Sequence, residues 1–138
     1  MEKENVITKV TEATKWVSSI VVVEKNDKVR ICLDPRDLNK AILRPHYPMP
    51  KIEEILPELK NVKLFSVFDL KQGFWQIKLD EESSLLTCFN TPFGRYRFLR
   101  MPFGINSASE YFQMKMHEIL QDIPGIHVFV DDILVCGI

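Results

Sequence analysis

The stretch IHVFVDDILVC (Ile126–Cys136) constrains the fold most, because two adjacent aspartates interrupt an otherwise apolar run. Most of its other residues are Val, Ile, Leu or Phe, which is typical of a buried or half-buried strand where acids are rare. The pattern predicts a hairpin, with one strand over Ile126–Val130 and a second over Ile133–Cys136. Aspartates are common in turns because they accept local hydrogen bonds, so the pair alone fits an ordinary hairpin equally well.

A third aspartate, Asp69, lies in another strand-like segment, Val62–Leu70. If this strand neighbours the hairpin in one sheet, three carboxylates gather within a few ångströms and repel one another unless cations bind. Hard divalent ions such as Mg²⁺ suit such a cluster, which is typical of two-metal phosphoryl transfer. A structural Ca²⁺ hairpin is a further alternative, but the segment lacks the D-x-[DN]-x-[DN]-G loop.

Composition narrows the class of protein. The 138 residues are 46% hydrophobic and 27% charged, as in a globular domain, and the net charge of −1 indicates no strongly basic nucleic-acid surface. Basic residues gather in two segments, 25–44 and 95–100, which alone indicate only solvated faces. No apolar run reaches a membrane-spanning length, and the charged amino terminus does not resemble a signal peptide. Three cysteines without a C-x-x-C pair favour free thiols and no zinc site, so we expect an intracellular rather than a secreted protein.

Hydrophobic periodicity and turn residues predict a mixture of strands and helices. We expect hairpins over 16–33 and 85–101, strands over 62–70 and 75–79, and an extended, proline-rich connector over 44–50. Helices are expected over 34–41, with Asp34 as the N-cap, over 51–59, and over 107–121, which begins with a capping box of Ser107 and Glu110.

Four segments together resemble successive blocks of the reverse transcriptase domain of gypsy-type LTR retrotransposons. In chain order they are RICLDPRDLNKAILRPHYPMPKIEEIL (Arg30–Leu56), VFDLKQGFWQIKL (Val67–Leu79), FGRYRFLRMPFGINSASEYFQ (Phe93–Gln113) and FVDDILV (Phe129–Val135). The similarity runs from about residue 13 to residue 136. Two positions depart from the family pattern, because Phe129 replaces a usual Tyr and Pro35 replaces a usual aromatic residue.

The resemblance implies an α+β fold, the fingers and palm of the polymerase right hand, with a mainly antiparallel palm sheet packed on helices and the thumb absent. Fingers are expected at about 1–45 and 77–106, and palm at about 46–76 and 107–138. The implied activity is that of an RNA-directed DNA polymerase, which extends a primer with dNTPs on an RNA or DNA template, in a cytoplasmic particle or the nucleus. Thumb, connection and ribonuclease H regions would belong to a larger polyprotein. An inactive or domesticated retroelement remnant that acts as a binding module is the alternative.

The resemblance also implies roles for individual residues. Asp69, Asp131 and Asp132 are the implied catalytic residues and hold two Mg²⁺ ions, with Mn²⁺ as an alternative ion. Lys25 and Arg30 are expected to contact the nucleotide triphosphate, and Phe74 to exclude a 2′-hydroxyl by steric clash, although without the motif Phe74 would simply be core. The full implied nucleotide-binding set is Lys25, Arg30, Leu70, Phe74, Phe103 and Gly104. Phe129 and Val130 are expected at the primer terminus.

Overall fold

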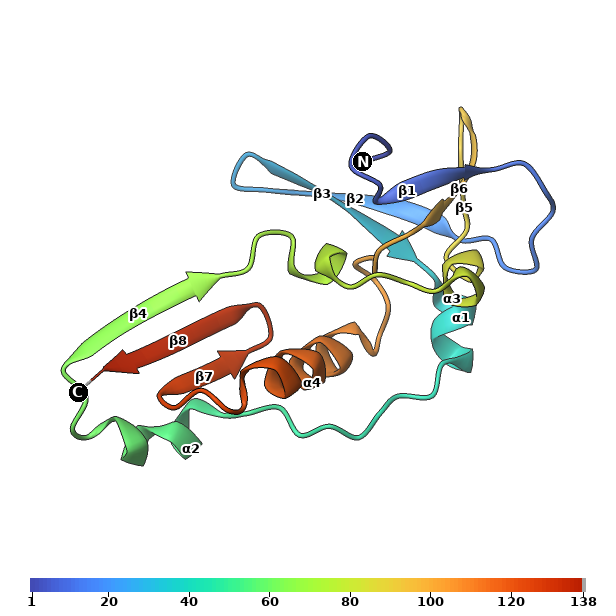
Figure 1. Ribbon diagram of the computed structural model, residues 1–138. Coiled ribbons are helices and arrows are strands. Elements are labelled where there is room, and N and C mark those ends of the chain that lie inside the picture. The colour runs from blue at the N-terminus through green and yellow to red at the C-terminus, as the bar shows by residue number, and fades with distance from the viewer. Residues whose placement is uncertain (138) are drawn as a thin grey trace. The chain divides into compact units, whose positions relative to one another are not determined.

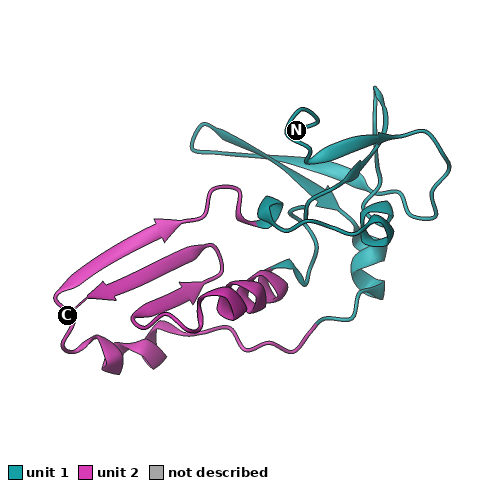
Figure 2. Cartoon of the chain, viewed as in Figure 1, with its two compact units in different colours: residues 1–44, 74–108 teal, residues 45–73, 109–138 magenta. Residues whose placement is uncertain are grey.

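The computed structural model describes residues 1–137, which form two compact units (Figure 2). Unit 1 comprises residues 1–44 and 74–108, and unit 2 comprises residues 45–73 and 109–138. The elements (Figure 1) are β1 Ile7–Val10, β2 Ser19–Lys25, β3 Lys28–Asp34, α1 Arg36–Ala41, α2 Ile52–Ile55, η1 Leu56–Leu59, β4 Leu64–Asp69, η2 Gly73–Gln76, α3 Glu81–Leu85, β5 Phe89–Thr91, β6 Gly94–Phe98, α4 Ala108–Leu120, β7 Ile126–Phe129 and β8 Asp132–Gly137.

In unit 1, β2 and β3 form the first predicted hairpin, with Lys25 paired to Lys28 across a two-residue turn. Asn26 and Asp27 both adopt left-handed backbone conformations, with φ of 52° and 58°. Asn and Asp tolerate this region better than other residues with side chains, and the favoured two-residue hairpin turns require it at one or both central residues. The sequence prediction of this hairpin is therefore confirmed.

The second sheet of unit 1 has the antiparallel order β1-β6-β5. Its core comprises Val6, Leu33, Phe89 and Phe98, which are each at most 5% exposed. Leu33 belongs to β3, so the hairpin contributes directly to the core of this unit. The hairpin predicted over 85–101 is confirmed only for β5 and β6, because residues 81–85 form the helix α3.

Two further predictions in unit 1 were wrong. Residues 75–79 do not form a strand, since residues 75 and 76 end the 3₁₀ helix η2 and Lys78 makes only an isolated bridge to Arg100. Trp75, in η2, packs against Phe103 with ring centroids 6.2 Å apart, so its burial comes from a contact of the helix and not from a strand face. Asp34 is not the N-cap of α1, because β3 extends through Asp34 and Pro35 takes the cap position.

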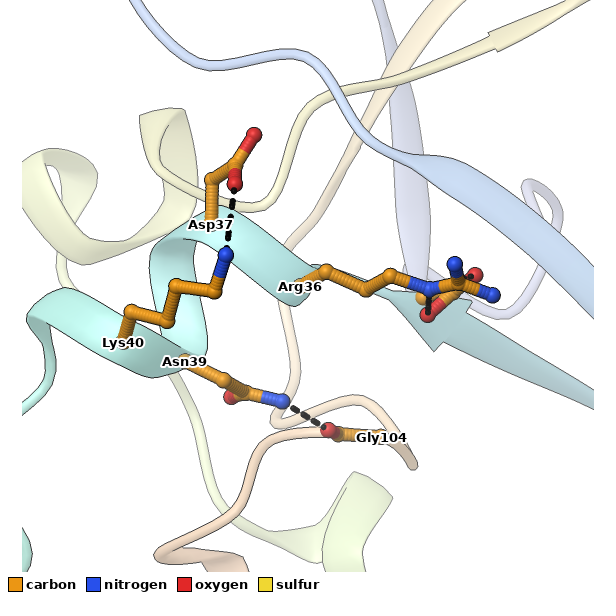
Figure 3. Close-up of polar contacts among 6 residues, drawn as sticks. Arg36, Asp37, Asn39, Lys40 and Gly104 are labelled. Carbon is orange, nitrogen blue, oxygen red and sulfur yellow. Dashed lines mark hydrogen bonds and ion pairs between the residues drawn. The ribbon is translucent and has the colours of Figure 1, made fainter.

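Helix α1 is tied through Asn39, in its second half, to the loop that carries Gly104 (Figure 3). The Asn39 side chain donates a 2.9 Å hydrogen bond to the Gly104 carbonyl, while Asp34 pairs with Arg36 at 3.3 Å. Gly104 has φ of +116°, and a Cβ built there would lie 1.9 Å from the Leu33 carbonyl oxygen. Only glycine fits this position, because both the backbone angle and the close approach exclude a side chain.

Unit 2 contains one three-stranded antiparallel sheet of order β4-β8-β7, with α4 and the short helices α2 and η1. Helix α4 agrees with the prediction to within one residue at each end. The helix expected over 51–59 changes from α2 to the 3₁₀ helix η1 at Leu56, one residue before Pro57, which has no N–H to continue an α-helical ladder.

Two further findings concern the helices as membrane spans and the state of the cysteines. Within residues 1–137, the helices are all too short or too polar to cross a membrane. Cys32, Cys88 and Cys136 are free thiols, as the absence of a C-x-x-C pair predicted.

Candidate metal centre

The three aspartates meet at one end of the sheet of unit 2. Asp69, the last residue of β4, pairs directly with Asp132, the first residue of β8. Phe129 pairs with Asp132 on the other side, so Val130 and Asp131 form a two-residue hairpin turn. Each aspartate offers a carboxylate oxygen, and these oxygens all lie within 4.8 Å of one another. The structure thus brings together the three side chains that the sequence predicted to be neighbours.

The cluster has the electrostatics of a site that prefers cations. Loss of some hydration beside the neighbouring atoms raises the pKa of the Asp132 carboxyl, and the negative charges of Asp131 and then Asp69 raise it further. Asp69 and Asp132 are exposed, so coordination positions stay open to water or to phosphate oxygens. Three carboxylates with open positions fit a hard divalent cation such as Mg²⁺, which takes few protein ligands.

Backbone contacts fix Asp131 within the cluster. The Leu70 N–H donates a 2.8 Å hydrogen bond to the Asp131 carbonyl, which ties the turn to the residue after β4. A Cβ built on Gly73 would lie 3.1 Å from the Asp131 Cβ and 3.4 Å from the Phe112 ring. The glycine therefore allows this segment to approach the turn more closely than a larger residue would.

The turn between β7 and β8 contains a strained residue. Val130 has φ of 56°, in the left-handed region, where a β-branched residue is an outlier that costs about 1–3 kcal/mol. The buried amide of Gln113, on α4, contacts this turn. Its Oε1 accepts a 2.6 Å hydrogen bond from the Val130 N–H, and its Nε2 donates a 2.8 Å bond to the Val128 carbonyl.

Sequence reasoning missed Gln113 and Gly73. In the sequence, Gln113 is only a polar residue directly after Phe112 in the predicted helix. The structure shows that both residues are buried, at 2% exposed each. The signal for Gly73 is a glycine four residues after Asp69, directly before the aromatic pair Phe74 and Trp75. Neither signal identifies a partner, because the turn that both residues contact lies far along the chain.

Unit 1 gathers three of the predicted nucleotide-binding residues in one contact cluster. The Arg30 guanidinium lies 4.4 Å from the centre of the Phe103 ring, and the Phe74 ring lies 5.1 Å from the same ring, centre to centre. Gly104 follows Phe103 and is held against β3, where the Phe103 carbonyl accepts a 2.7 Å hydrogen bond from the Leu33 N–H. Phe74 is half-buried, and the contact with Arg30 gives Phe103 a polar neighbour.

The other predicted residues belong to other segments of the two units. Lys25 is at the turn end of β2, and Arg30 pairs with Val23, so alternation along the strands places Lys25 and Arg30 on one face of the hairpin. Leu70 belongs to unit 2 and contacts Asp131 as described. Phe129 ends β7 and Val130 occupies the turn, so both predicted primer-terminus residues adjoin the aspartates.

Antiparallel sheets with helices, and an aspartate cluster at a strand end and hairpin turn, are the features expected of a polymerase palm. The sequence model of the family described as reverse transcriptase (RNA-dependent DNA polymerase) matches residues 22–137. The chain belongs to the reverse transcriptase family, and the gypsy-type resemblance is confirmed.

Curated relatives are parts of retroelement polyproteins. The retrovirus-related Pol polyproteins from transposons 297 and 412 of Drosophila melanogaster are 41% and 42% identical over 111 and 112 residues, or 79% and 80% of this chain. That from transposon gypsy of the same organism is 38% identical over 112 residues, or 80% of this chain. The chain spans about a tenth of the length of these relatives, which is 10%, 9% and 11% in the same order.

Solved structures show the same fold. A foamy viral protease-reverse transcriptase in complex with double-stranded DNA superposes with a TM-score of 0.88 and 29% identity, over 99% of this chain and 24% of the other. The same kind of protein in complex with an RNA/DNA hybrid gives 0.84 and 29%, over 99% and 18%. The predicted α+β fold of fingers-palm type is therefore confirmed.

Proposed function

We propose that this chain is the fingers and palm portion of an RNA-directed DNA polymerase, with fingers at about 1–45 and 77–106 and palm at about 46–76 and 107–138. It extends a primer with dNTPs on an RNA or DNA template. The observation that carries the proposal is the direct pairing of Asp69 with Asp132, which joins three carboxylates in one cluster. The division into two compact units supports the assignment of fingers and palm.

In the proposed reaction, the primer 3′-oxygen bonds to the α-phosphorus of a dNTP, pyrophosphate leaves with the broken P–O bond's electrons, and the hydroxyl proton passes to water. Asp69, Asp131 and Asp132 would hold two Mg²⁺ ions through their carboxylate oxygens. Such ions, when bound, would supply charge stabilisation for the deprotonated 3′-hydroxyl and the leaving pyrophosphate. Phe129 and Val130, which adjoin the aspartates, orient the end of the primer.

Residues of unit 1 select and bind the nucleotide in this proposal. Arg30 and Lys25 contact the triphosphate oxygens, and Arg30 is suited to bind two of them at once. Stacking on Phe103 restricts the Arg30 guanidinium, so less side-chain freedom is lost when a phosphate binds. Phe74 packs under the sugar and excludes a 2′-hydroxyl, while the Phe103–Gly104 loop and Leu70 line the nucleotide site.

Primer extension on an RNA template, with the full chain, dNTPs and Mg²⁺, tests the proposal. We expect extension that requires Mg²⁺, is abolished in Asp131→Asn and persists in Asp122→Asn, which alters an exposed aspartate in the turn after α4. Extension that survives Asp131→Asn would contradict the metal role.

The same preparation separates enzyme from binding module. If the chain binds a primed template in a filter assay but extends no primer under any metal condition, the alternative of a non-catalytic retroelement remnant is favoured.

A second substitution, Phe74→Val, addresses substrate selection. We expect it to increase incorporation of ribonucleotides relative to deoxyribonucleotides, because it removes the proposed steric clash.

A further inference from the structure

We propose that Gln113 is a positioning residue for the metal centre, which holds the β7–β8 turn in the one conformation that presents Asp131 and Asp132 together. The proposal rests on the metal-binding function proposed above. Gln113 does not touch the carboxylates. It acts through the backbone of Val130, the residue before Asp131.

Both ends of the Gln113 amide are used on the turn. Oε1 accepts the Val130 N–H at 2.6 Å, and Nε2 donates to the Val128 carbonyl at 2.8 Å. The acceptor faces a donor and the donor faces an acceptor, so the pair of contacts determines the orientation of the amide. The side chain is 2% exposed, so water does not compete for these bonds.

The two hairpins of the chain make the need for such a contact clear. The β2–β3 turn places Asn26 and Asp27 in left-handed conformations, and these residue types accept that region. The β7–β8 turn places Val130 there, although a β-branched side chain disfavours it. The residue types at this turn do not favour the observed conformation. Gln113 supplies two hydrogen bonds that stabilise it.

The conformation of Val130 determines where Asp131 lies. Asp131 is the next residue, and its carbonyl already accepts the Leu70 N–H at 2.8 Å. Its Cβ lies against Gly73, where an added methyl would be only 3.1 Å away. Asp131 is therefore fixed on the β4 side, and Gln113 fixes the turn from the α4 side. If Val130 relaxes to an ordinary backbone angle, the two-residue turn between Phe129 and Asp132 no longer closes in the same way, and we expect Asp131 to move relative to Asp69 and Asp132.

The test measures Mn²⁺ binding to the full chain by electron paramagnetic resonance, well below its melting temperature. Gln113→Met is close in volume and cannot form either hydrogen bond, and we expect it to weaken Mn²⁺ binding about 10- to 100-fold, as loss of a supporting hydrogen bond does at other metal sites. Gln121→Met makes the same chemical change at an exposed position just after α4, and we expect about the wild-type affinity. Unchanged affinity in Gln113→Met, even with a lower melting temperature, would overturn the proposal.

Amide hydrogen exchange at Val130 gives a readout that needs no metal. We expect slow exchange in the wild-type chain and exchange at least about 10-fold faster in Gln113→Met, because the Val130 N–H loses its acceptor. Equal exchange rates would overturn the proposal. If the wild-type chain binds no Mn²⁺, or Asp131→Asn binds it equally well, the proposed function fails, and this exchange experiment still decides whether Gln113 holds the turn.

If Gln113→Met does not fold by itself, the same substitution can be tested in a chain that also carries Val130→Gly. Val130→Gly removes the side-chain strain, since glycine adopts left-handed angles readily. In that background we expect Gln113→Met to weaken Mn²⁺ binding only about threefold or less, because the turn no longer depends on the two hydrogen bonds. A loss of about 10-fold or more there would show that Gln113 does not act through Val130.

Discussion

Asp69 and Asp132 lie directly opposite each other across strands β4 and β8, and Asp131 adjoins them from the hairpin turn. Directly paired residues of antiparallel strands have their side chains on the same face, so like charges repel there. The arrangement reduces stability when no cation is present. We therefore expect substitution of Asp132 to change the stability of the fold in opposite directions with and without bound metal.

Without divalent metal, we expect Asp132→Asn to be slightly more stable than the wild-type chain. The substitution removes repulsion from two neighbouring carboxylates, but solvent screens exposed charges, so the gain is at most about 1 kcal/mol. Thermal unfolding in the presence of a chelator measures it. Asp122→Asn serves as the control for loss of one negative charge, and a wild-type chain more stable than Asp132→Asn would contradict the expectation.

With Mg²⁺, we expect the order to reverse. A free ion concentration about 100 times the dissociation constant stabilises a binding-competent fold by about 2.7 kcal/mol. The wild-type chain gains this stabilisation, whereas Asp132→Asn gains little because one ligand is lost. The same unfolding measurement in a Mg²⁺ series checks the reversal, and equal Mg²⁺ stabilisation of both chains would remove the aspartates from the metal site.

Gly104→Ala is expected to destabilise unit 1 by about 2 kcal/mol or more. The added methyl group meets the Leu33 carbonyl, and φ of +116° disfavours any side chain. Gly137→Ala is the matched control, because its built Cβ has no neighbour closer than 3.6 Å. Urea unfolding of the two variants should differ clearly, and similar midpoints would show that the loop relaxes without cost.

Thr87→Val is expected to destabilise the chain by about 1–3 kcal/mol, although the two side chains have nearly the same shape. The Thr87 hydroxyl accepts the Phe98 N–H at 2.9 Å and donates to the Ser84 carbonyl at 2.6 Å, and the residue is 4% exposed. Valine leaves the Phe98 N–H without this acceptor, while the Ser84 carbonyl keeps its 3.0 Å hydrogen bond from the backbone N–H of residue 87. Thr11→Val, at an exposed position, is the control in the same unfolding experiment, and equal effects would contradict the expectation.

We expect the free energy of unfolding to depend on pH through Asp80, which caps helix α3. It is the N-cap of this helix, and the hydrogen bond from the Ser83 N–H, at 2.7 Å, lowers the pKa of its carboxyl. The stabilisation is complete above the unfolded-state pKa of about 3.9 and is lost as pH falls through the lower folded-state value. We therefore expect Asp80→Ala to melt below the wild-type chain at neutral pH, and the difference to shrink in acid. A difference that stays constant into acid would contradict this linkage, and Asp122→Ala is the control.

Local chemistry made several elements predictable. The turn at Asn26 and Asp27 and the amphipathic helix over residues 108–120 depend on residue types close together in the chain, and both were predicted within a residue or two. The strand predicted over 75–79 was wrong, because apolar alternation does not distinguish a strand from the end of a 3₁₀ helix, where Trp75 packs on Phe103, followed by an isolated bridge. Helix α3 was missed although Asp80 is a typical N-cap residue, because four of the five residues 85–89 are apolar and indicated a strand.

By itself, the sequence determined the family, through four ordered blocks, and the identity of three aspartates suited to a divalent cation. Only the tertiary structure decided that Asp69 stands opposite Asp132, and that Gln113 reaches the strained turn at Val130. The physical reason is that strand register and helix–turn contacts between distant segments depend on how whole elements pack and pair their backbone groups, whereas capping, turn preference and hydrophobic periodicity act only between near neighbours in the chain.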